Sequence, residues 1–167
     1  MSKALDFYLD LCSSGAIEKD QNQIDLLTEL EIFLSNSDKN IFSKIFKFSS
    51  QENSVICFYL HGNVGSGKTL LMDLISKVIL SKKLMRIHFH EFMIKTHNSL
   101  HELRANNYSK DDLISSYAKM IQLETDVIFF DEFQVTNIAD AMILSQLFTE
   151  FFNRKIKIVL TTNTLKI

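Results

Sequence analysis

The stretch GNVGSGKT, residues 62–69, constrains the fold of this 167-residue chain more than any other part of it. It holds three of the four glycines, followed at once by a lysine and a threonine, and it fits the pattern G-x-x-x-x-G-K-[ST]. An apolar run at 55–60 precedes it, and residues 69–80 have a helical pattern. A strand, a glycine turn and a helix in this order predict a loop that wraps a phosphate chain.

Each residue type in this loop has a chemical reason. Glycine permits the backbone conformations that turn successive N–H groups inward, and the following helix adds unpaired N–H groups and the positive end of its dipole. Lys68 supplies a mobile charge for the outer phosphates, and Thr69 supplies a hydroxyl ligand for Mg²⁺. The residues expected to bind the nucleotide are Gly62, Asn63, Val64, Gly65, Ser66, Gly67, Lys68, Thr69 and Leu70.

Strand and helix patterns alternate along the chain. Short apolar runs predict strands at 55–60, 85–90, within 126–133 and at 155–163, the first of them buried on both faces. Helical patterns occupy 3–11, 20–34, 69–80, 92–104, 111–124 and 138–152, while 35–40 has the composition of a linker and 41–48 fits either a helix or a strand. Helices between strands require crossover connections, so we expect an α/β fold with a largely parallel sheet covered on both faces.

The helix patterns also predict caps and inward faces. Asp20 is expected to cap the helix at 20–34, with Gln23 as the second half of a capping box. Met120 and Ala141 are expected on the inward faces of the helices at 111–124 and 138–152.

Acidic and amide residues follow two of the predicted strands. Asp131 and Glu132 come after four apolar residues, and Asn163 ends the strand at 155–163. Because open parallel sheets bind ligands at the carboxyl ends of their strands, we expect Asp131 to hold Mg²⁺ and Glu132 to take a proton from an attacking water. Asn163 could orient that water or contact the γ-phosphate. Carboxylates at strand ends are often simply solvated, and an asparagine after a strand is usually a turn residue. The prediction therefore depends on these residues sharing one edge of the sheet.

Composition excludes several classes of function. The net charge of −2 argues against a nucleic-acid binder that uses its whole surface. A GTPase would carry an N-K-x-D signature, which does not occur, and three arginines are few for the lid of a small-molecule kinase.

The sequence also indicates a compartment. The N-terminus lacks an apolar signal core, and no apolar run approaches the roughly 20 residues of a membrane span. Two cysteines without a paired motif favour a reducing compartment. Lys82, Lys83 and Arg86 are expected on a solvated face.

Longer segments carry a family resemblance. FYLHGNVGSGKTLLMDL, RIHFHEFM, ETDVIFFDEFQVTNIADAMIL and TTN resemble the ZapE-type ATPases of the AAA+ class, as does FYLDLCSSGAIEKDQNQIDLLTEL near the start. The resemblance implies a P-loop fold that binds ATP with Mg²⁺, with Lys68 in the phosphate loop, Thr69 and Asp131 at the metal, Glu132 as catalytic base and Asn163 as sensor. His88 and His90 match paired histidines of the family, to which we assign no role.

The resemblance also sets expectations for organisation and cellular role. The family continues beyond this asparagine with a helix, a fifth strand and an arginine that reaches a neighbouring subunit's nucleotide, so this chain resembles an N-terminal portion, truncated after its fourth strand. We expect a helical segment at 1–50 and a partial P-loop ATPase domain at 51–167. The resemblance implies a homo-oligomer in the full-length form and a protein partner in cell division or membrane-protein quality control. It also implies a location in the bacterial cytoplasm rather than in mitochondria.

Other interpretations compete with this one. The chain could be a non-catalytic nucleotide-binding fragment, because none of its arginines occupies the position of the one that completes a neighbour's site. Where that arginine operates, it raises the rate of hydrolysis by about 10³–10⁵. It could also be a helicase-loader-like AAA+ protein, although RIHFHEFM favours the ZapE type. His88 and His90 on one strand and His97 and His101 on one helix face could bind a metal, but no zinc spacing accompanies them, and hydrogen-bonded or surface histidines are expected instead.

Overall fold

Ten helices and strands make up the parts of the chain that the computed structural model describes, which are residues 3–35, 57–79, 83–109 and 112–163. In order they are α1 (Lys3–Ser13), α2 (Gln21–Ser35), β1 (Cys57–His61), α3 (Lys68–Val78), β2 (Leu84–His88), α4 (Phe89–Ala105), α5 (Leu113–Glu124), β3 (Val127–Asp131), α6 (Ile138–Asn153) and β4 (Lys157–Thr162). The predictions for 41–48, and for 35–40 beyond its first residue, lie outside the described residues.

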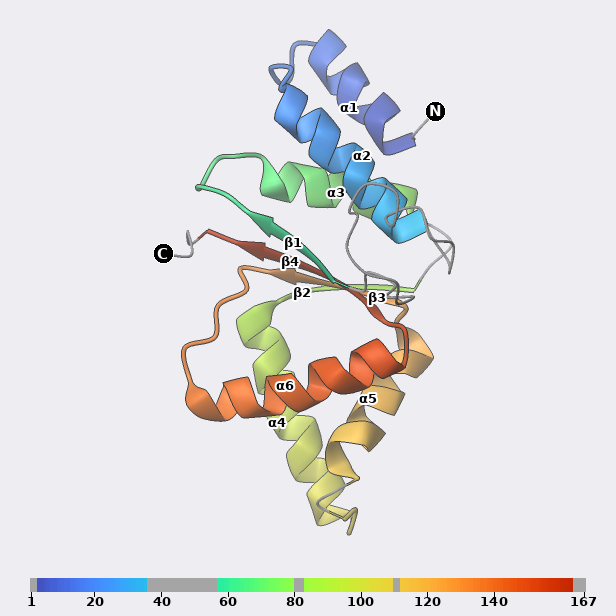
Figure 1. The fold of residues 1–167 in the computed structure, drawn as a ribbon, viewed down its shortest axis with the longest axis vertical. Coiled ribbons are helices and arrows are strands. Elements are labelled where there is room, and N and C mark those ends of the chain that lie inside the picture. Colours follow the sequence, from blue (N-terminus) through green and yellow to red (C-terminus); the bar gives the residue numbers. More distant parts are fainter. Residues whose placement is uncertain (1–2, 36–56, 80–82, 110–111, 164–167) are drawn as a thin grey trace, which may run out of the picture.

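The four strands form one parallel sheet in the order β1-β4-β3-β2, as Figure 1 shows. Residues 127–130 of β3 are completely buried, because this continuous apolar run lies between two strands and beneath helices on both faces. In a parallel sheet all carboxyl ends meet at the same edge. The predicted α/β fold with a largely parallel sheet is therefore confirmed.

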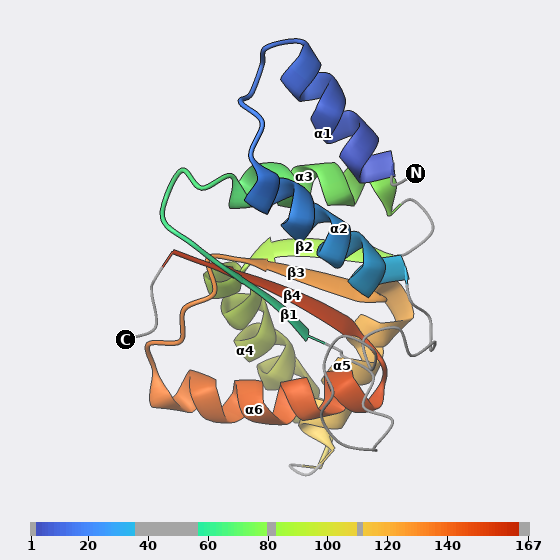
Figure 2. The same cartoon turned by 45° about the horizontal axis from the view of Figure 1, so that its top comes forward.

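Two layers of helices cover the sheet. Figures 1 and 2 show α1, α2 and α3 over one face and α4, α5 and α6 over the other. Successive residues of β3 supply the two cores in turn: Phe129 packs among Leu27, Leu71 and their neighbours, and Phe130 packs with Phe92 and others. The sheet thus holds both helix layers at fixed positions around the edge where the carboxyl ends of its strands meet.

The start of α2 partly follows its predicted capping pattern. The backbone N–H of Asn22 donates to Asp20 Oδ1 at 2.8 Å, which confirms Asp20 as the cap. The prediction that Gln23 completes a capping box was wrong. Its side chain instead contacts Tyr8 on α1 and Ser66 in the glycine loop, which are long-range partners that the local pattern does not show.

Several expectations about exposure and element ends were wrong. Tyr59 is 42% exposed, because β1 lies at the edge of the described sheet and is covered less than an inner strand. β2 ends at His88 and α4 begins at Phe89, so His90 lies on a helix and the two histidines do not share a strand face. Met120 and Ala141 are exposed rather than inward.

Within the described parts of the chain, none of the helices combines the length and the apolar character that a membrane span requires.

Candidate functional site

The loop at 62–69 connects the carboxyl end of β1 to the first turn of α3, as predicted. Gly65 and Gly67 have φ values of +85° and +86°, a region that side chains oppose. A Cβ at Gly62 would lie 2.8 Å from Ser66 Oγ, and one at Gly67 would lie 2.5 Å from Gln23 Nε2. The backbone conformation therefore favours glycine at Gly65 and Gly67, whereas a Cβ at Gly62 or Gly67 would force the side chain of Ser66 or Gln23 to shift.

Lys68 places its ammonium group inside the curve of this loop. The Nζ atom donates to Gly62 O at 2.8 Å, to Asn63 O at 2.9 Å and to Ser66 Oγ at 3.3 Å. Lys68 is also the first residue of α3, where helix N–H groups have no partner within the helix. The loop therefore brings one mobile positive charge and the positive end of a helix dipole to the same place.

The acidic residues lie at the carboxyl end of β3, in the middle of the sheet. Asp131 pairs in register with His88 of β2, and its side chain is 17% exposed. Glu132 follows with a φ of +56°, and its side chain is 70% exposed. The Glu132 N–H donates to Thr161 Oγ1 at 3.2 Å on β4. A non-glycine residue in this left-handed conformation is a strained feature of the kind that clusters at functional sites.

The neighbouring strand β4 connects the loop to the acidic residues. The N–H of Gly62 donates to Thr162 O at 3.4 Å, and the N–H of Phe133 donates to Thr161 O at 2.6 Å. Asn163 follows Thr162 directly, so it lies at the same sheet edge as the glycine loop and Asp131. The structure thus brings together the predicted loop, acidic and amide residues, although their chemical roles stay predictions.

Arg86 also belongs to this site, although the sequence pattern around it does not indicate this. Its Nε atom donates to Asp131 Oδ2 at 2.8 Å, and its Nη1 atom makes an ion pair with Asp73 on α3. Burial lowers the pKa of the guanidinium, but the hydrogen bonds and charges of Asp73 and Asp131 outweigh it and raise that pKa above its usual value. The expectation of a solvated face was therefore wrong for Arg86, which is buried to about three quarters of its side-chain surface.

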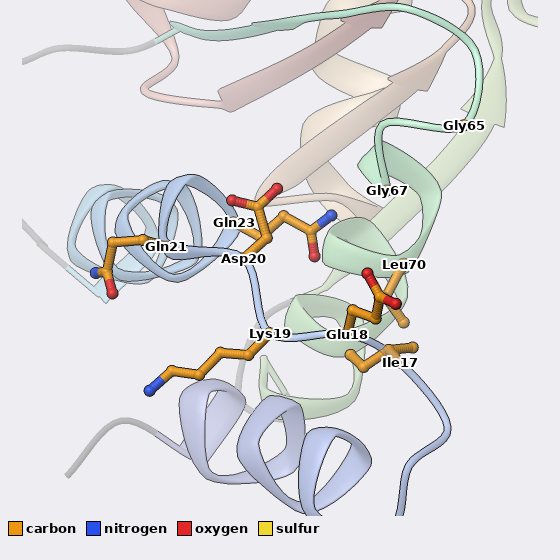
Figure 3. A pocket seen from close by; sticks show the side chains of 9 residues that line it. All are labelled: Ile17, Glu18, Lys19, Asp20, Gln21, Gln23, Gly65, Gly67 and Leu70. Atoms are coloured by element: carbon orange, nitrogen blue, oxygen red, sulfur yellow. The ribbon is translucent and has the colours of Figure 1, made fainter.

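The α1–α2 connection forms a second missed part of the site. A pocket of about 610 Å³ lies between this connection and the glycine loop, and Figure 3 shows the side chains that line it. Gln23 Nε2 donates to Ser66 O at 3.2 Å, while the buried Tyr8 hydroxyl donates to Gln23 Oε1 at 3.0 Å and accepts from the Asp20 N–H at 3.0 Å. Helix α2 is therefore in direct contact with the loop through Gln23, and α1 holds that side chain through Tyr8.

The paired histidines have different surroundings. His88 Nδ1 lies 3.9 Å from Glu132 Oε2, with both side chains mostly exposed. His97 Nε2 lies 2.7 Å from Asp140 Oδ1 on α6. Within the described residues, no three histidine, cysteine or acidic side chains gather in a group that could hold a metal.

The residues present suit a nucleotide with Mg²⁺. The left-handed conformations at Gly65 and Gly67 shape the loop, and its oxygens gather around the ammonium group of Lys68, which is free to turn toward a phosphate. Thr69 and Asp131 offer hard oxygen ligands, and Mg²⁺ is commonly bound by only one or two such protein groups with phosphates and water. The site chemistry therefore fits without a larger ligand cluster.

Comparisons with known proteins agree with this arrangement. The cell-division protein ZapE of Escherichia coli strain K12 is 33% identical over 93% of this chain and 44% of its own length. Lactation elevated protein 1 homolog B of Danio rerio is 42% identical over 64% of this chain and 22% of its own. The chain thus spans less than half the length of these curated relatives.

A solved structure of DnaI has a related fold. It matches with a TM-score of 0.51 at 15% identity, covering 91% of this chain and 71% of that one, a similarity that establishes the fold alone. A sequence model of the AFG1-like ATPase family matches residues 4–166, which is nearly the whole chain. With a parallel sheet between two helix layers and a phosphate-loop pattern at its edge, this chain belongs to the AFG1-like ATPases.

Proposed function

We propose that this chain binds ATP with Mg²⁺ and contributes the hydrolytic residues of an ATPase. The observation that carries the proposal is the meeting of two chemistries at one sheet edge. Lys68 lies within a glycine loop on one side of β4, and Asp131 and Glu132 lie on the other side. A triphosphate across this edge would meet cationic and N–H donors first and carboxylates at its far end.

The loop would bind the phosphates through its backbone N–H groups and the start of α3. Lys68 would exchange its contacts with the carbonyls of Gly62 and Asn63 for contacts with the outer phosphates, because an ammonium group is attracted more strongly to an anion than to a neutral carbonyl. Binding therefore requires only a local movement of this side chain.

Thr69 and Asp131 would hold Mg²⁺, which supplies Lewis-acid stabilisation of the charge on the phosphates. Glu132 would accept a proton from the attacking water, and its exposed carboxylate is accessible to that water. The Thr161 hydroxyl accepts a hydrogen bond from the Glu132 N–H and so supports the left-handed backbone at this residue. Asn163 would orient the water or contact the γ-phosphate.

The pocket beside the loop is where we place the base of the nucleotide. Its volume of about 610 Å³ lies within the usual range for small-molecule sites, roughly 300–1,000 Å³. Ile17 and Leu70 offer apolar surface to a flat base, and both line this pocket. Adenine is the proposed base, since the family is named for ATPase activity and the sequence has no guanine signature.

The cellular role is carried over as part of the proposal. ZapE is named as a cell-division protein, so we propose that this protein acts in the cytoplasm, where it assembles with copies of itself and remodels a protein partner in division or membrane-protein quality control. A nucleic-acid role is not proposed, given the net charge of −2.

Equilibrium binding of a fluorescent ATP analogue tests the core of the proposal. The chain is expected to bind ATP more tightly than GTP, and Lys68→Ala is expected to abolish binding because phosphate charge is left uncompensated. Lys119→Ala, at an exposed position of α5, is the matched control and should bind as the unaltered chain does. Undiminished affinity in Lys68→Ala would show that the phosphates bind elsewhere. Binding without any hydrolysis would instead favour a non-catalytic nucleotide-binding fragment.

A further inference from the structure

An arginine links the two halves of the proposed metal site. Arg86 lies on β2, the strand beside β3 at the edge of the described sheet, and its guanidinium contacts two carboxylates on different elements. One is Asp131 at the end of β3, and the other is Asp73 on α3. The proposed metal ligands Thr69 and Asp131 belong to these same two elements, α3 and β3.

The spacing along α3 makes this link specific. Asp73 follows Thr69 by four residues, so the two side chains lie on the same face of the helix, one turn apart. A contact that holds Asp73 therefore fixes the rotation and distance of the helix face that carries the Thr69 hydroxyl. The same guanidinium fixes the Asp131 carboxylate, so a single side chain sets both positions.

The atoms used leave room for a cation. Arg86 Nε contacts Oδ2 of Asp131, which directs the carboxylate plane and leaves Oδ1 as the oxygen for metal coordination. A guanidinium can serve two carboxylates at once because it is planar and presents N–H groups along different edges, whereas a lysine ammonium is a point charge on a flexible stem. The low exposure of Arg86 and Asp131, at 25% and 17% of their side chains, reduces solvent screening of this contact.

We propose that Arg86 is a positioning residue that, through its bridge between Asp131 and Asp73, sets the geometry in which Thr69 and Asp131 receive Mg²⁺ with the nucleotide. The inference rests on the proposed function, which needs the metal site but does not involve Arg86 or Asp73. The bridge acts only on the part of the nucleotide affinity that depends on Mg²⁺. The contacts between the phosphate loop and the phosphates do not involve Arg86 or Asp73.

The test measures the affinity of a fluorescent ATP analogue twice for each variant, once with Mg²⁺ and once with a chelator. The ratio of the two dissociation constants is the gain due to the metal. Arg86→Gln and Asp73→Asn are expected to lower this gain by about 10-fold or more, as is usual when a partner of a metal ligand is removed. The affinity with chelator should stay within about twofold of the unaltered chain, since the two sites act separately there.

Three further variants separate bridging from other roles. Arg86→Gln combined with Asp73→Asn should lose no more than Arg86→Gln alone, because that substitution already removes both contacts of the bridge, including the one with Asp73. Arg86→Lys should fail to restore the gain, since a lysine cannot bridge the two carboxylates. Arg104→Gln, at an exposed position in the last turn of α4, is the matched control and should keep the full gain.

Each remaining outcome decides the matter. An unchanged or larger gain in Arg86→Gln, or full rescue by Arg86→Lys, would overturn the inference while leaving the proposed function intact. An equal loss of affinity with and without Mg²⁺ would show that Arg86 only supports the fold. If the unaltered chain bound no nucleotide, or bound it with no gain from Mg²⁺, the proposed function itself would fail and take the inference with it.

Discussion

Replacement of Gly67 by alanine tests how closely the N-terminal helices and the phosphate loop are fitted together. Gly67 has a φ of +86°, and an added Cβ would lie 2.5 Å from Gln23 Nε2 and 3.1 Å from Gln23 Cδ. Gly65 has nearly the same φ, +85°, but an added Cβ there meets nothing within 4 Å. Gly65→Ala therefore measures backbone strain alone, and Gly67→Ala measures strain together with displacement of Gln23.

The expected magnitudes follow from these contacts. The left-handed conformation costs alanine about 1–2 kcal/mol, partly offset by a gain of about 0.4–1 kcal/mol from the less flexible unfolded chain. Moving Gln23 breaks its bonds to Ser66 O and the Tyr8 hydroxyl, at about 1 kcal/mol each. Gly65→Ala should thus lower the free energy of unfolding by about 1 kcal/mol, and Gly67→Ala by about 3 kcal/mol.

Urea unfolding of a double-mutant cycle measures the difference. In a Gln23→Ala background the displaced amide is absent, so Gly67→Ala should cost only about 1 kcal/mol there, as Gly65→Ala does. The coupling between Gln23 and Gly67 is then about 2 kcal/mol. If both glycine substitutions cost the same, or if the Gln23→Ala background gave no relief, Gln23 would not restrain the loop.

Two other predictions concern single side chains. Glu132→Gln should keep nucleotide affinity but abolish phosphate release in a steady-state assay, because an amide cannot accept the proton of the attacking water; an unchanged rate would place the base elsewhere. Tyr8→Phe should lower the free energy of unfolding by about 1–3 kcal/mol in urea, because the Asp20 N–H and Gln23 Oε1 lose the partner that the buried hydroxyl supplies. Stability equal to that of the unaltered chain would mean that water or other groups replace this hydroxyl.

The parts of the fold that follow from local signals could be predicted from the sequence. The apolar run at 127–130 indicates a strand buried on both faces whatever its neighbours are, and the glycine loop places a strand before it and a helix after it. Polar residues directly after strands must share an edge once the sheet is parallel. The positions of Asp131 and Asn163 relative to the loop therefore followed from pattern alone.

Features that depend on the order of the strands, or on contacts between residues far apart in the sequence, could not be predicted in this way. The exposure of Tyr59 results from the place of β1 at the edge of the described sheet, and no pattern within 55–60 indicates strand order. Arg86 has partners 13 and 45 residues away, so nothing near it in the sequence distinguishes it from a solvated basic residue. Gln23 is similar: its spacing from Asp20 suggested a cap, but its contact in the glycine loop lies 43 residues away.

A crystal structure with a non-hydrolysable ATP analogue and Mg²⁺ would show whether nucleotide and metal bind at this sheet edge. We expect a triphosphate enclosed by the N–H groups of residues 62–69, the ammonium of Lys68 turned from Gly62 O toward the phosphates, and a metal between Thr69 and Asp131. A nucleotide bound away from this loop, or a metal that contacts neither Thr69 nor Asp131, would contradict this expectation.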